Sequence, residues 1–417
     1  MIQISEKKEC CGCEGCYNVC PIKCISMEYD EEGFKFPSVD KKKCIKCNLC
    51  ENVCPIINKS IKKVDYIEGY AALNTNDTSR LKSSSGGVFS LLAQEIIDLG
   101  GIVVGVSMSQ DCKVAQHIIV DSKKDLELLL GSKYLQSNIG NRYQKIKNEL
   151  NNKRTVLFSG TPCQVVALHR YLGKEYENLI CIDLICHGVP SPGLWKKNVE
   201  YIENKTKAVL KSVNFRYKKE QMNLEHSILY PNVCYKSKDE DSFFRMFMKE
   251  YSLRLSCYDC KFKGISRISD ITLGDFWGIN DFCPGMDDGK GCSLVVIQST
   301  KGKELFSRIK NYLKIKKVNI EKVFEKHNDA MIRSSKLPIA REVFWKDYQI
   351  LNFEKLSKKY VSLTAKEKIR KFFRKVGLLE KIRKIRRGVV TSNSFGMLYV
   401  IKKVDEKNNN REDVTHN

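Results

Sequence analysis

Residues 10–21 read CCGCEGCYNVCP, and residues 44–55 read CIKCNLCENVCP. Both stretches contain the spacing C-x2-C-x2-C-x3-C-P, which is the bacterial spacing for a pair of cubane [4Fe–4S] clusters. In that arrangement the fourth cysteine of each run binds the cluster that the other run holds. The spacing therefore predicts two clusters in a ferredoxin-type domain of residues 1–60, with these cysteine ligands: Cys10, Cys13, Cys16, Cys20, Cys44, Cys47, Cys50 and Cys54.

The competing interpretation of the same cysteines is structural zinc. Zinc sites usually show two separated C-x2-C knuckles rather than four cysteines crowded into one short run, so the spacing favours iron–sulfur clusters. Cys11 and Cys24 lie outside the pattern, and we expect each of them to be a small buried residue beside a cluster. Between the two runs, residues 27–40 (MEYDEEGFKFPSVD) predict a β-hairpin with Gly33 in its turn.

The composition predicts a metal-binding cytoplasmic protein. The chain has 417 residues, enough for two or three domains, and 19 of them are cysteines. Its first residues, MIQISEKKEC, lack the apolar core of a secretory signal, so we expect a reducing environment in which cysteines bind metal. No apolar run in the sequence approaches the length that a membrane-spanning helix needs.

Positive charge is concentrated near the C-terminus. The formal net charge is +23, and nearly half of it lies between Lys358 and Arg387. The rest is spread over the body as a solvated surface, so specific nucleic-acid binding is weakly supported. In residues 351–417 we expect a basic amphipathic helix, followed by a disordered end. This helix is expected either to contact an anionic membrane surface or an acidic partner, or to pack on the protein's own body.

Strand-like and helix-like segments alternate through the middle of the chain. Strands are expected in residues 66–73 and 101–108, a loop and helix in 81–100, and strand–loop–helix units in 154–173 and 178–199. This alternation predicts an α/β body with a mixed, partly parallel sheet, divided into residues 61–150 and 151–350. Functional residues are then expected in loops just after strand ends, because ligands bind at the carboxyl edge of such sheets.

The first such loop is residues 83–87, SSSGG, directly before the helical pattern of residues 88–96. The glycines allow a phosphate to approach the free amides at the start of a helix. A plain serine N-cap with glycines for the turn explains the same residues equally well. The loop matches neither the dinucleotide fingerprint nor the P-loop.

The second such loop is residues 159–164, SGTPCQ, after an apolar strand. Pro162 is expected to begin a helix, which places Cys163 at a helix N-terminus, a position that favours a thiolate nucleophile. Cys186 ends the next strand, and Cys257 and Cys260 form a further C-x2-C pair. These four cysteines are enough ligands for one more cubane cluster, although single cysteines are commonly just buried.

Residues 269–278, SDITLGDFWG, place two acids around a short apolar strand and then an aromatic pair between glycines. Such a turn can bring a tryptophan against a planar cofactor. The simpler expectation is that Trp277 is buried beside a tight turn.

Together these motifs resemble the coenzyme F420 hydrogenase/dehydrogenase beta-subunit family, here joined to an N-terminal two-cluster ferredoxin domain. The matching pieces occur in order between about residue 65 and about residue 305: SSGGVFSLLA, GSKYLQSN, FSGTPCQ, LICHGVPSP, SCYDCKF and SDITLGDFWG. Members of this family carry FAD and a further [4Fe–4S] cluster. The resemblance thus implies an α/β flavin-binding body that exchanges electrons with an iron–sulfur chain.

Site residues follow from the resemblance motif by motif. It implies that the ligands of the third cluster are Cys163, Cys186, Cys257 and Cys260. It also implies a flavin pocket that includes Ser85, Gly86, Gly87, Lys133, Tyr134, Gln136 and Thr161. His187 follows a ligand cysteine. It is either a proton donor to a substrate that lies over the flavin, or a structural histidine that positions its neighbours without contacting the substrate. A deazaflavin substrate is not inherited with the fold.

The predicted function is therefore that of an iron–sulfur flavoprotein oxidoreductase. It passes electrons between a hydride carrier or organic substrate at FAD and [4Fe–4S] clusters, with ferredoxin or a hydride-carrier coenzyme as redox partner. The alternative is a non-catalytic electron-transfer adaptor in a larger redox complex. A third interpretation, nucleic-acid binding through the basic tail, predicts a steep salt dependence.

Overall fold

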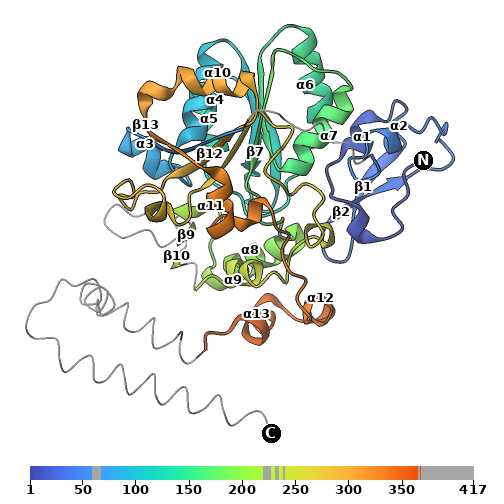
Figure 1. Ribbon diagram of the computed structural model, residues 1–417. Helices are drawn as coiled ribbons and strands as arrows, with labels where there is room; N and C mark the ends of the chain where they lie inside the picture. Colours follow the sequence, from blue (N-terminus) through green and yellow to red (C-terminus); the bar gives the residue numbers. More distant parts are fainter. Residues whose placement is uncertain (59–66, 219–226, 231–233, 238–239, 365–366, 368–417) are drawn as a thin grey trace, which may run out of the picture. The chain divides into compact units, whose positions relative to one another are not determined.

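A mixed eight-stranded sheet runs through the body of the protein (Figure 1). In this computed structural model the described residues are 1–58, 67–218, 227–230, 234–237, 240–364 and 367. The strands, in their order across the sheet, are β13 (Leu313–Val318), β3 (Glu68–Asn74), β12 (Ser293–Ile297), β11 (Ile271–Asp275), β7 (Leu179–Leu184), β6 (Val156–Gly160), β4 (Ile102–Met108) and β5 (Ala115–Val120).

The centre of this sheet is parallel and its edges are antiparallel. β11 pairs with β7, β7 with β6 and β6 with β4 in parallel, whereas the remaining neighbours are antiparallel. The prediction of an α/β body with a mixed, partly parallel sheet is confirmed. Because the central strands are parallel, the loops that follow them reach one edge of the sheet, where functional residues are expected.

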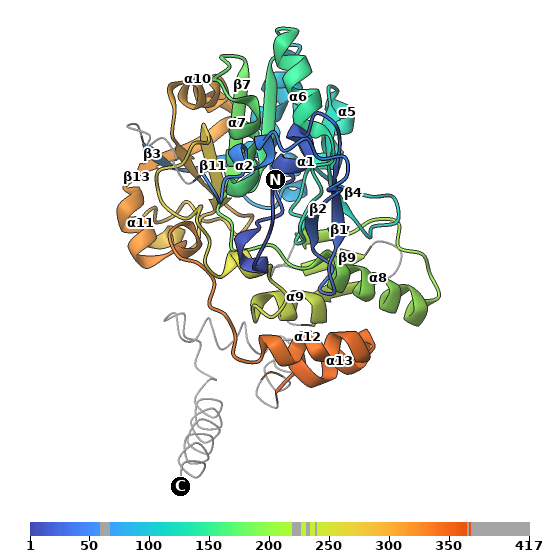
Figure 2. The ribbon, with the colours of Figure 1, turned by 90° about the vertical axis from the view of Figure 1, so that its right-hand side faces the viewer.

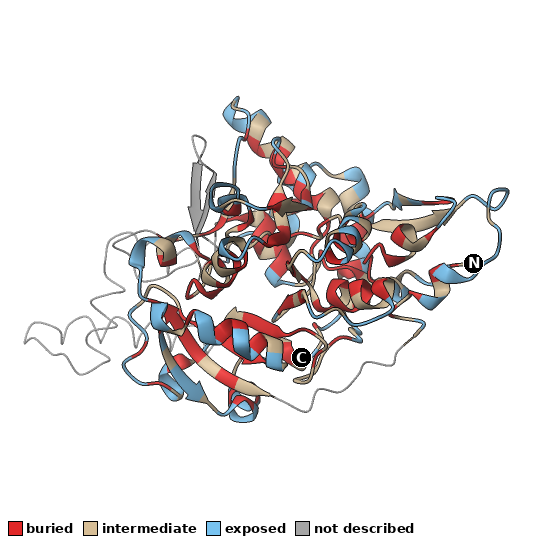
Figure 3. Cartoon of the chain, turned by 90° about the horizontal axis from the view of Figure 1, so that it is seen from above, coloured by how far each residue is buried: buried red, intermediate tan, exposed pale blue. Residues whose placement is uncertain are grey.

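Helices cover both faces of the sheet with their apolar sides, which buries the central strands (Figure 3). Alternate strand residues face opposite sides, so Val103 and Leu157 lie in one core and Val104 and Phe158 in the other. The first core is completed by helices α4 (Val88–Asp98) and α10 (Thr300–Arg308). The second is completed by α6 (Arg142–Asn151) and α7 (Pro162–Leu172), and a third core lies under α11 (Ile320–Lys326).

Further elements complete the first unit of the chain, residues 1–360. They are α3 (Asp77–Lys82), α5 (Lys123–Leu126), α8 (Pro192–Thr206), α9 (Ser242–Met248), α12 (Arg341–Ile350), α13 (Phe353–Val361) and a small sheet, in the order β10-β9-β8, of β8 (Asn214–Tyr217), β9 (Ser227–Tyr230) and β10 (Cys234–Ser237). The second unit is residues 361–417, and the basic helix that the sequence predicts there lies outside the described residues apart from residue 367.

The two cysteine runs of the N-terminal region have similar backbone conformations as well as similar sequences. Helices α1 (Gly15–Val19) and α2 (Leu49–Asn52) each begin after a left-handed residue, Glu14 and Asn48, both with φ of 58°. Between them the strands β1 (Ile25–Tyr29) and β2 (Lys35–Val39) form the expected antiparallel hairpin. Gly33 in its turn has φ of 80°, a conformation that glycine adopts without steric cost.

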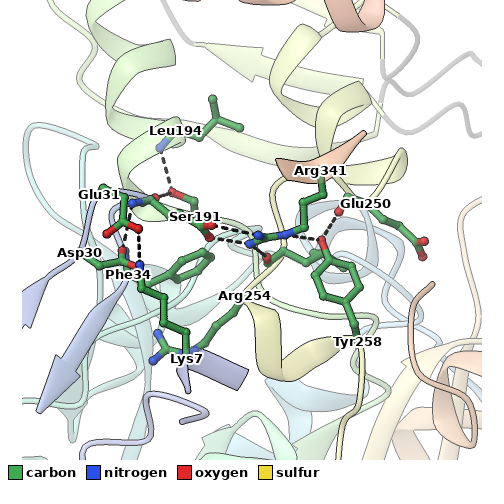
Figure 4. A network of polar contacts seen from close by, with 12 residues as sticks. Lys7, Asp30, Glu31, Phe34, Ser191, Leu194, Glu250, Arg254, Tyr258 and Arg341 are labelled. Carbon is green, nitrogen blue, oxygen red and sulfur yellow. Dashed lines mark hydrogen bonds and ion pairs between the residues drawn. The ribbon is translucent and has the colours of Figure 1, made fainter. Parts of the chain in front are cut away.

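This region packs on the body through α1, which contacts α6 and α7 (Figure 2). Two buried arginines of the body reach into it (Figure 4). Arg341 holds both carboxylate oxygens of Glu32, with its Nη1 at 2.9 Å from Oε1. Arg254 donates from Nε to the carbonyl oxygen of Cys10 at 2.6 Å and from Nη2 to that of Lys35 at 3.0 Å. The hairpin and the first cysteine loop are therefore fixed to the body by charge-assisted hydrogen bonds.

The structure contradicts two local expectations: the serine N-cap, one of two interpretations of residues 83–87, and the buried Trp277. No serine caps α4; its N-cap is Gly87, with φ of 80°, and Ser83 instead donates from Oγ to the carbonyl of Ser79. Trp277 is half exposed, at 50%, because the turn after β11 carries its side chain to the surface. In the parts of the chain that the structure describes, no helix is long and apolar enough to span a bilayer.

We expect Arg341→Met to destabilise the protein by about 3–5 kcal/mol, because it leaves the Glu32 carboxylate buried without its charged partner. Burial already raises the pKa of Glu32 although Arg341 lies beside it. Denaturant unfolding followed by tryptophan fluorescence measures the loss. The matched control is Lys346→Met, whose pair with Glu342 is exposed on both sides and should change little. Equal losses in the two variants would contradict the assignment.

A second expectation concerns acid stability. Burial lowers the pKa of His117 to about 4, and its ring stacks on Phe158 with Nε2 at 3.1 Å from the carbonyl oxygen of Ser159. Between pH 6.5 and pH 4 the unfolded chain therefore binds a proton at this residue that the folded chain does not, and stability falls as pH falls. His117→Gln should flatten this dependence by about 3 kcal/mol across that window. Parallel pH profiles of unfolding free energy would refute the expectation.

Candidate functional site

Four cysteines of the body gather around one cavity of about 470 Å³. Cys163 is the second residue of α7, directly after β6, and Cys186 follows β7. Cys257 ends the short helix Leu255–Cys257, and Cys260 stands in the loop after it. Three separate segments of the chain thus bring together the four cysteines that the resemblance assigns to one cluster. Pro162 begins α7, as expected.

The cysteine thiols of this cavity influence one another. The pKa of Cys186 is raised to about 12, chiefly by burial; Lys263 opposes this shift, and the sulfurs of Cys163 and Cys260 add to it. Cys163 differs, because hydrogen bonds from Cys11 and then Thr161 lower its pKa to about 7 although burial opposes them. The hydroxyl of Thr161 lies 3.1 Å from its sulfur. Cys163 is therefore the thiol of this group that ionises most easily.

Basic side chains surround the same cavity. Lys263 and Arg267 line it, and Lys263 donates from Nζ to the carbonyl oxygen of Cys186 at 2.5 Å. Thiolate ligands carry negative charge, so these cations favour their ionised form. Among the described residues no three His, Cys, Asp or Glu side chains are placed around a single metal ion. A cubane cluster does not require its ligands to surround a single ion, because its four cysteines bind a group of several irons.

One set of N-terminal cysteines faces the body. We call Cys10, Cys13, Cys16 and Cys54 the inner set. Burial raises the pKa of Cys16 well above its usual value, and the nearby sulfurs of Cys13, Cys10 and Cys54 add to the effect. Cys13 packs within the core that α6 and α7 form, and Cys54 lines the cavity of the body cysteines. The set thus combines three cysteines of the first run with the fourth of the second run, as the repeat predicts.

The remaining N-terminal cysteines form the outer set, Cys20, Cys44, Cys47 and Cys50, around a small hollow of their own. Cys47 is exposed, whereas Cys50 is buried and accepts a hydrogen bond at 3.1 Å from the amide of Ile2. The two additional cysteines are both buried, as expected: Cys24 lies 3.4 Å from Cys20, and Cys11 lies against Cys13 and Cys163.

The serine–glycine loop lies next to the edge strand of the small sheet. Gly86 has no room for a side chain, because a Cβ would lie 2.4 Å from the carbonyl oxygen of Ala72. Ser85 donates from Oγ to the carbonyl oxygen of Cys292 at 2.8 Å. Ser84 accepts hydrogen bonds from the amide and the hydroxyl of Ser132, the residue before Lys133. The loop and the segment 132–134 are therefore joined directly.

Two cations of β8 and the loop that follows it project onto this loop. Arg216 donates to the carbonyl oxygen of Ser84 at 3.1 Å and to the hydroxyl of Tyr134 at 3.0 Å, and pairs with Asp275 at 2.7 Å. Lys218 donates from Nζ to the carbonyl oxygen of Ser85 at 2.6 Å. Burial, followed by the charge of Arg216, lowers the pKa of Lys218 to about 7. Arg216 is thus paired with an acid, whereas the hydrogen bonds of the Lys218 ammonium go to the carbonyl oxygens of Arg80, Ser85 and Lys290.

One phenylalanine ring connects the two parts of the site. The His187 ring meets Phe247 edge-on at 5.5 Å between centroids, and Tyr134 lies 5.4 Å from the same ring. His187 lines the cysteine cavity, and its Nε2 lies 3.3 Å from Glu250. Burial lowers the pKa of His187 although Glu250 opposes the shift. The serine–glycine loop and the body cysteines are thus neighbours across Phe247.

Two of the expected flavin residues, Gln136 and Thr161, make contacts away from the loop, and the side chain of Lys133 turns from the loop to its own segment. Gln136 donates to the carbonyl oxygen of Cys11 at 3.1 Å and accepts from Arg254, so it contacts the N-terminal domain. Thr161 lines the cysteine cavity. The Lys133 ammonium is bound to the carbonyl oxygens of residues 128 and 130, and burial lowers its pKa to about 7.

Arg216, Lys218 and Arg254 belong to none of the motifs that are recognisable in the sequence. The segment NFRYK does contain a usable signal, because residues two apart on a strand project to the same side. Arg216 and Lys218 have this spacing around Tyr217, and both side chains reach the serine–glycine loop. Arg254 has no comparable local signal, since its partners lie more than a hundred residues away in the chain.

Comparison with known proteins confirms the family resemblance over part of the body. Residues 153–323 match the family that is described as the C terminus of the coenzyme F420 hydrogenase/dehydrogenase beta subunit. A solved chain from the F420-reducing [NiFe] hydrogenase complex of Methanosarcina barkeri is 16% identical, with a TM-score of 0.42, over 71% of this chain and 91% of that one. No curated protein sequence matches the chain.

Proposed function

Residues 153–323 match a family of redox subunits, and on that premise we propose that the protein is a FAD- and [4Fe–4S]-dependent oxidoreductase. It passes electrons between a hydride carrier or organic substrate and iron–sulfur clusters or a ferredoxin. One observation carries this proposal. Cys163, Cys186, Cys257 and Cys260 meet around one cavity that Cys54 of the N-terminal domain also lines.

The donor sets fit three cubane clusters. The inner and the outer set follow the dicluster spacing, and the body cysteines supply a third set of four. The Arg254 guanidinium, which contacts the Cys10 carbonyl, and the body's Lys263 and Arg267 place positive charge beside two of these sets. Such charges and hydrogen bonds are the means by which a protein tunes the potential of a cluster.

The serine–glycine loop fits an anionic cofactor such as FAD, whose diphosphate needs cations and amides. The buried Nε of Arg216 and Nδ2 of Asn74 make no hydrogen bond within the described part of the chain, and both lie beside the loop. A bound diphosphate would also stabilise the charged form of Lys218. FAD converts the two electrons of a hydride into single electrons that clusters accept.

We assign His187 a supporting role in preference to direct proton donation. It lines the cysteine cavity, its carbonyl accepts from Ser335 at 2.8 Å, and its ring contacts Phe247. These contacts fix the position of His187, which lies between the ligand cysteine Cys186 and the aromatic cluster that contains Tyr134. Proton donation by His187 would require the substrate to bind on the side of Phe247 on which His187 lies.

Iron content tests the cluster assignment. Anaerobically purified protein should contain about twelve irons and matching sulfide per chain, four for each cubane cluster. Replacing Cys257 and Cys260 together by serine should lower this to about eight. The matched control replaces Cys283 and Cys292, which are buried in the core under α11 and away from the cavity, and should keep about twelve irons.

Other results would revise the proposal. Wild-type protein with about eight irons would remove the body cluster, and bound zinc would remove the redox role of the N-terminal domain. Clusters without flavin after anaerobic reconstitution would favour the alternative function, an electron-transfer adaptor in a larger complex.

Arg216→Gln tests the flavin site. Loss of one charge-assisted contact should weaken FAD binding by roughly 10- to 100-fold, measured by the fluorescence of flavin released on titration. The control is Arg308→Gln, an arginine of α10 on the protein surface. Iron content confirms that each variant is folded. Unchanged FAD affinity in Arg216→Gln would contradict the placement of the flavin at this loop.

A further inference from the structure

Among the twelve predicted ligand cysteines, all of them described, only Cys47 of the outer set is exposed, although Cys20 and Cys50 of the same set are buried. Within this set Cys44 is half-buried, whereas the inner set packs against α6 and α7 and the body cysteines surround a cavity. Electron transfer to another protein requires close approach of the two redox groups. A partner of this protein therefore has to approach the loop that carries Cys44, Cys47 and Cys50.

That loop is basic. Residues 41–49 read KKKCIKCNL, with four lysines and no acid, and Lys23 extends the same exposed surface from the fourth cysteine of the first run. We call Lys23, Lys41, Lys42 and Lys46 the lysine collar. All of them are exposed, and within the described residues none forms an ion pair, whereas Lys43 pairs with Asp40 at 3.2 Å. The collar thus retains its full positive charge toward solvent.

The nearby acids do not neutralise the collar. Glu51 pairs with the N-terminal ammonium at 2.8 Å, and Asp40 accepts from the amide of Lys42 in addition to its pair with Lys43. Within the collar three large apolar side chains are exposed: Ile22 at 38%, Leu49 at 40% and Ile45 at 63%. An apolar centre with a charged rim is the composition of a transient protein interface.

We propose that the lysine collar and these apolar residues form the docking site for an acidic one-electron carrier protein of the ferredoxin class. The inference rests on the proposed function, because it assigns a partner surface to the cluster of the outer set. In the forward direction the reduced carrier loses one electron and the outer-set cluster gains it. No covalent bond forms or breaks, and the reverse transfer uses the same contacts.

The alternative anionic partner is a lipid surface. It matches the charge of the collar, but it contains no redox group to exchange electrons with the exposed cysteine loop. Three apolar side chains clustered around cysteine ligands also suit a small protein surface, where complementary charge mainly raises the rate of encounter. We therefore commit to a protein carrier, and lipid binding becomes an outcome of the test.

The test measures binding of an oxidised, acidic plant-type [2Fe–2S] ferredoxin to the full chain by titration at low and high salt. The variant carries Lys41→Ala, Lys42→Ala and Lys46→Ala. At low salt its Kd should rise by about 10-fold or more relative to wild type. At high salt the difference should shrink, because the Debye length falls to about 3 Å at 1 M.

The matched control removes the same charge elsewhere, through Lys314→Ala, Lys316→Ala and Lys322→Ala. These lysines are exposed on β13 and α11, and their loss should change Kd by less than about 2-fold if only local charge matters. The basic C-terminal segment is present in both variants and cancels in the comparison. Equal weakening in the two variants, or none in either, overturns the proposal. Collar-dependent binding to phosphatidylserine vesicles with no collar-dependent ferredoxin binding also overturns it.

Iron analysis separates this proposal from the function on which it rests. If the chain holds its clusters and dithionite bleaches them, yet the collar variant binds ferredoxin like the control, only the docking site is wrong. If wild-type chain holds no clusters, the proposed function itself fails. If alanine at the collar lowers the iron content, Lys41→Gln, Lys42→Gln and Lys46→Gln retain most of the side-chain length while removing the charge, and unchanged binding in that variant overturns the docking site.

Discussion

The parallel arrangement of β6, β7 and β11 is the constraint on which the rest of the structure depends. Parallel strands deliver the loops that follow them to one edge of the sheet. Cys163 and Cys186 come directly after two of these strands, so they must lie close together. The pair Cys257 and Cys260 comes before β11, and the loop that leads into this strand, rather than the strand direction, brings the pair to the same cavity. An antiparallel pairing of β6 with β7 would place Cys163 and Cys186 at opposite edges of the sheet.

Buried cations connect this edge to its neighbours. Arg254 joins the first cysteine loop, and Arg341 the hairpin, to the body, while Arg216 joins the serine–glycine loop to Tyr134 and Asp275. Burying a cation without hydrogen-bond or charged partners costs free energy, so each of these side chains requires particular partners around it. The cavity, the inner cysteine set and the serine–glycine loop are consequently held as one unit. This suits electron transfer, which depends on short and constant separations between redox groups.

Local signals predicted local structure well. The cysteine repeat, the hairpin with Gly33 and the start of α7 at Pro162 were all recognisable, because each depends on a few adjacent residues. The predicted serine cap and the buried Trp277 were wrong for a related reason. A glycine with positive φ replaced the cap, and a tight turn directed the indole outward; both results depend on the path of the chain rather than on residue type.

The sequence by itself determined which cysteines form ligand-like runs, the alternation of strands and helices, and the likeness to a family of redox subunits. Spacing along the chain is enough for these conclusions because a run of four cysteines is a local pattern. Tertiary structure alone decided which set faces solvent, why Gln136 contacts Cys11 instead of the serine–glycine loop, and how Arg216 meets Asp275. These pairs are far apart in sequence, and only the order and direction of the strands bring them into contact.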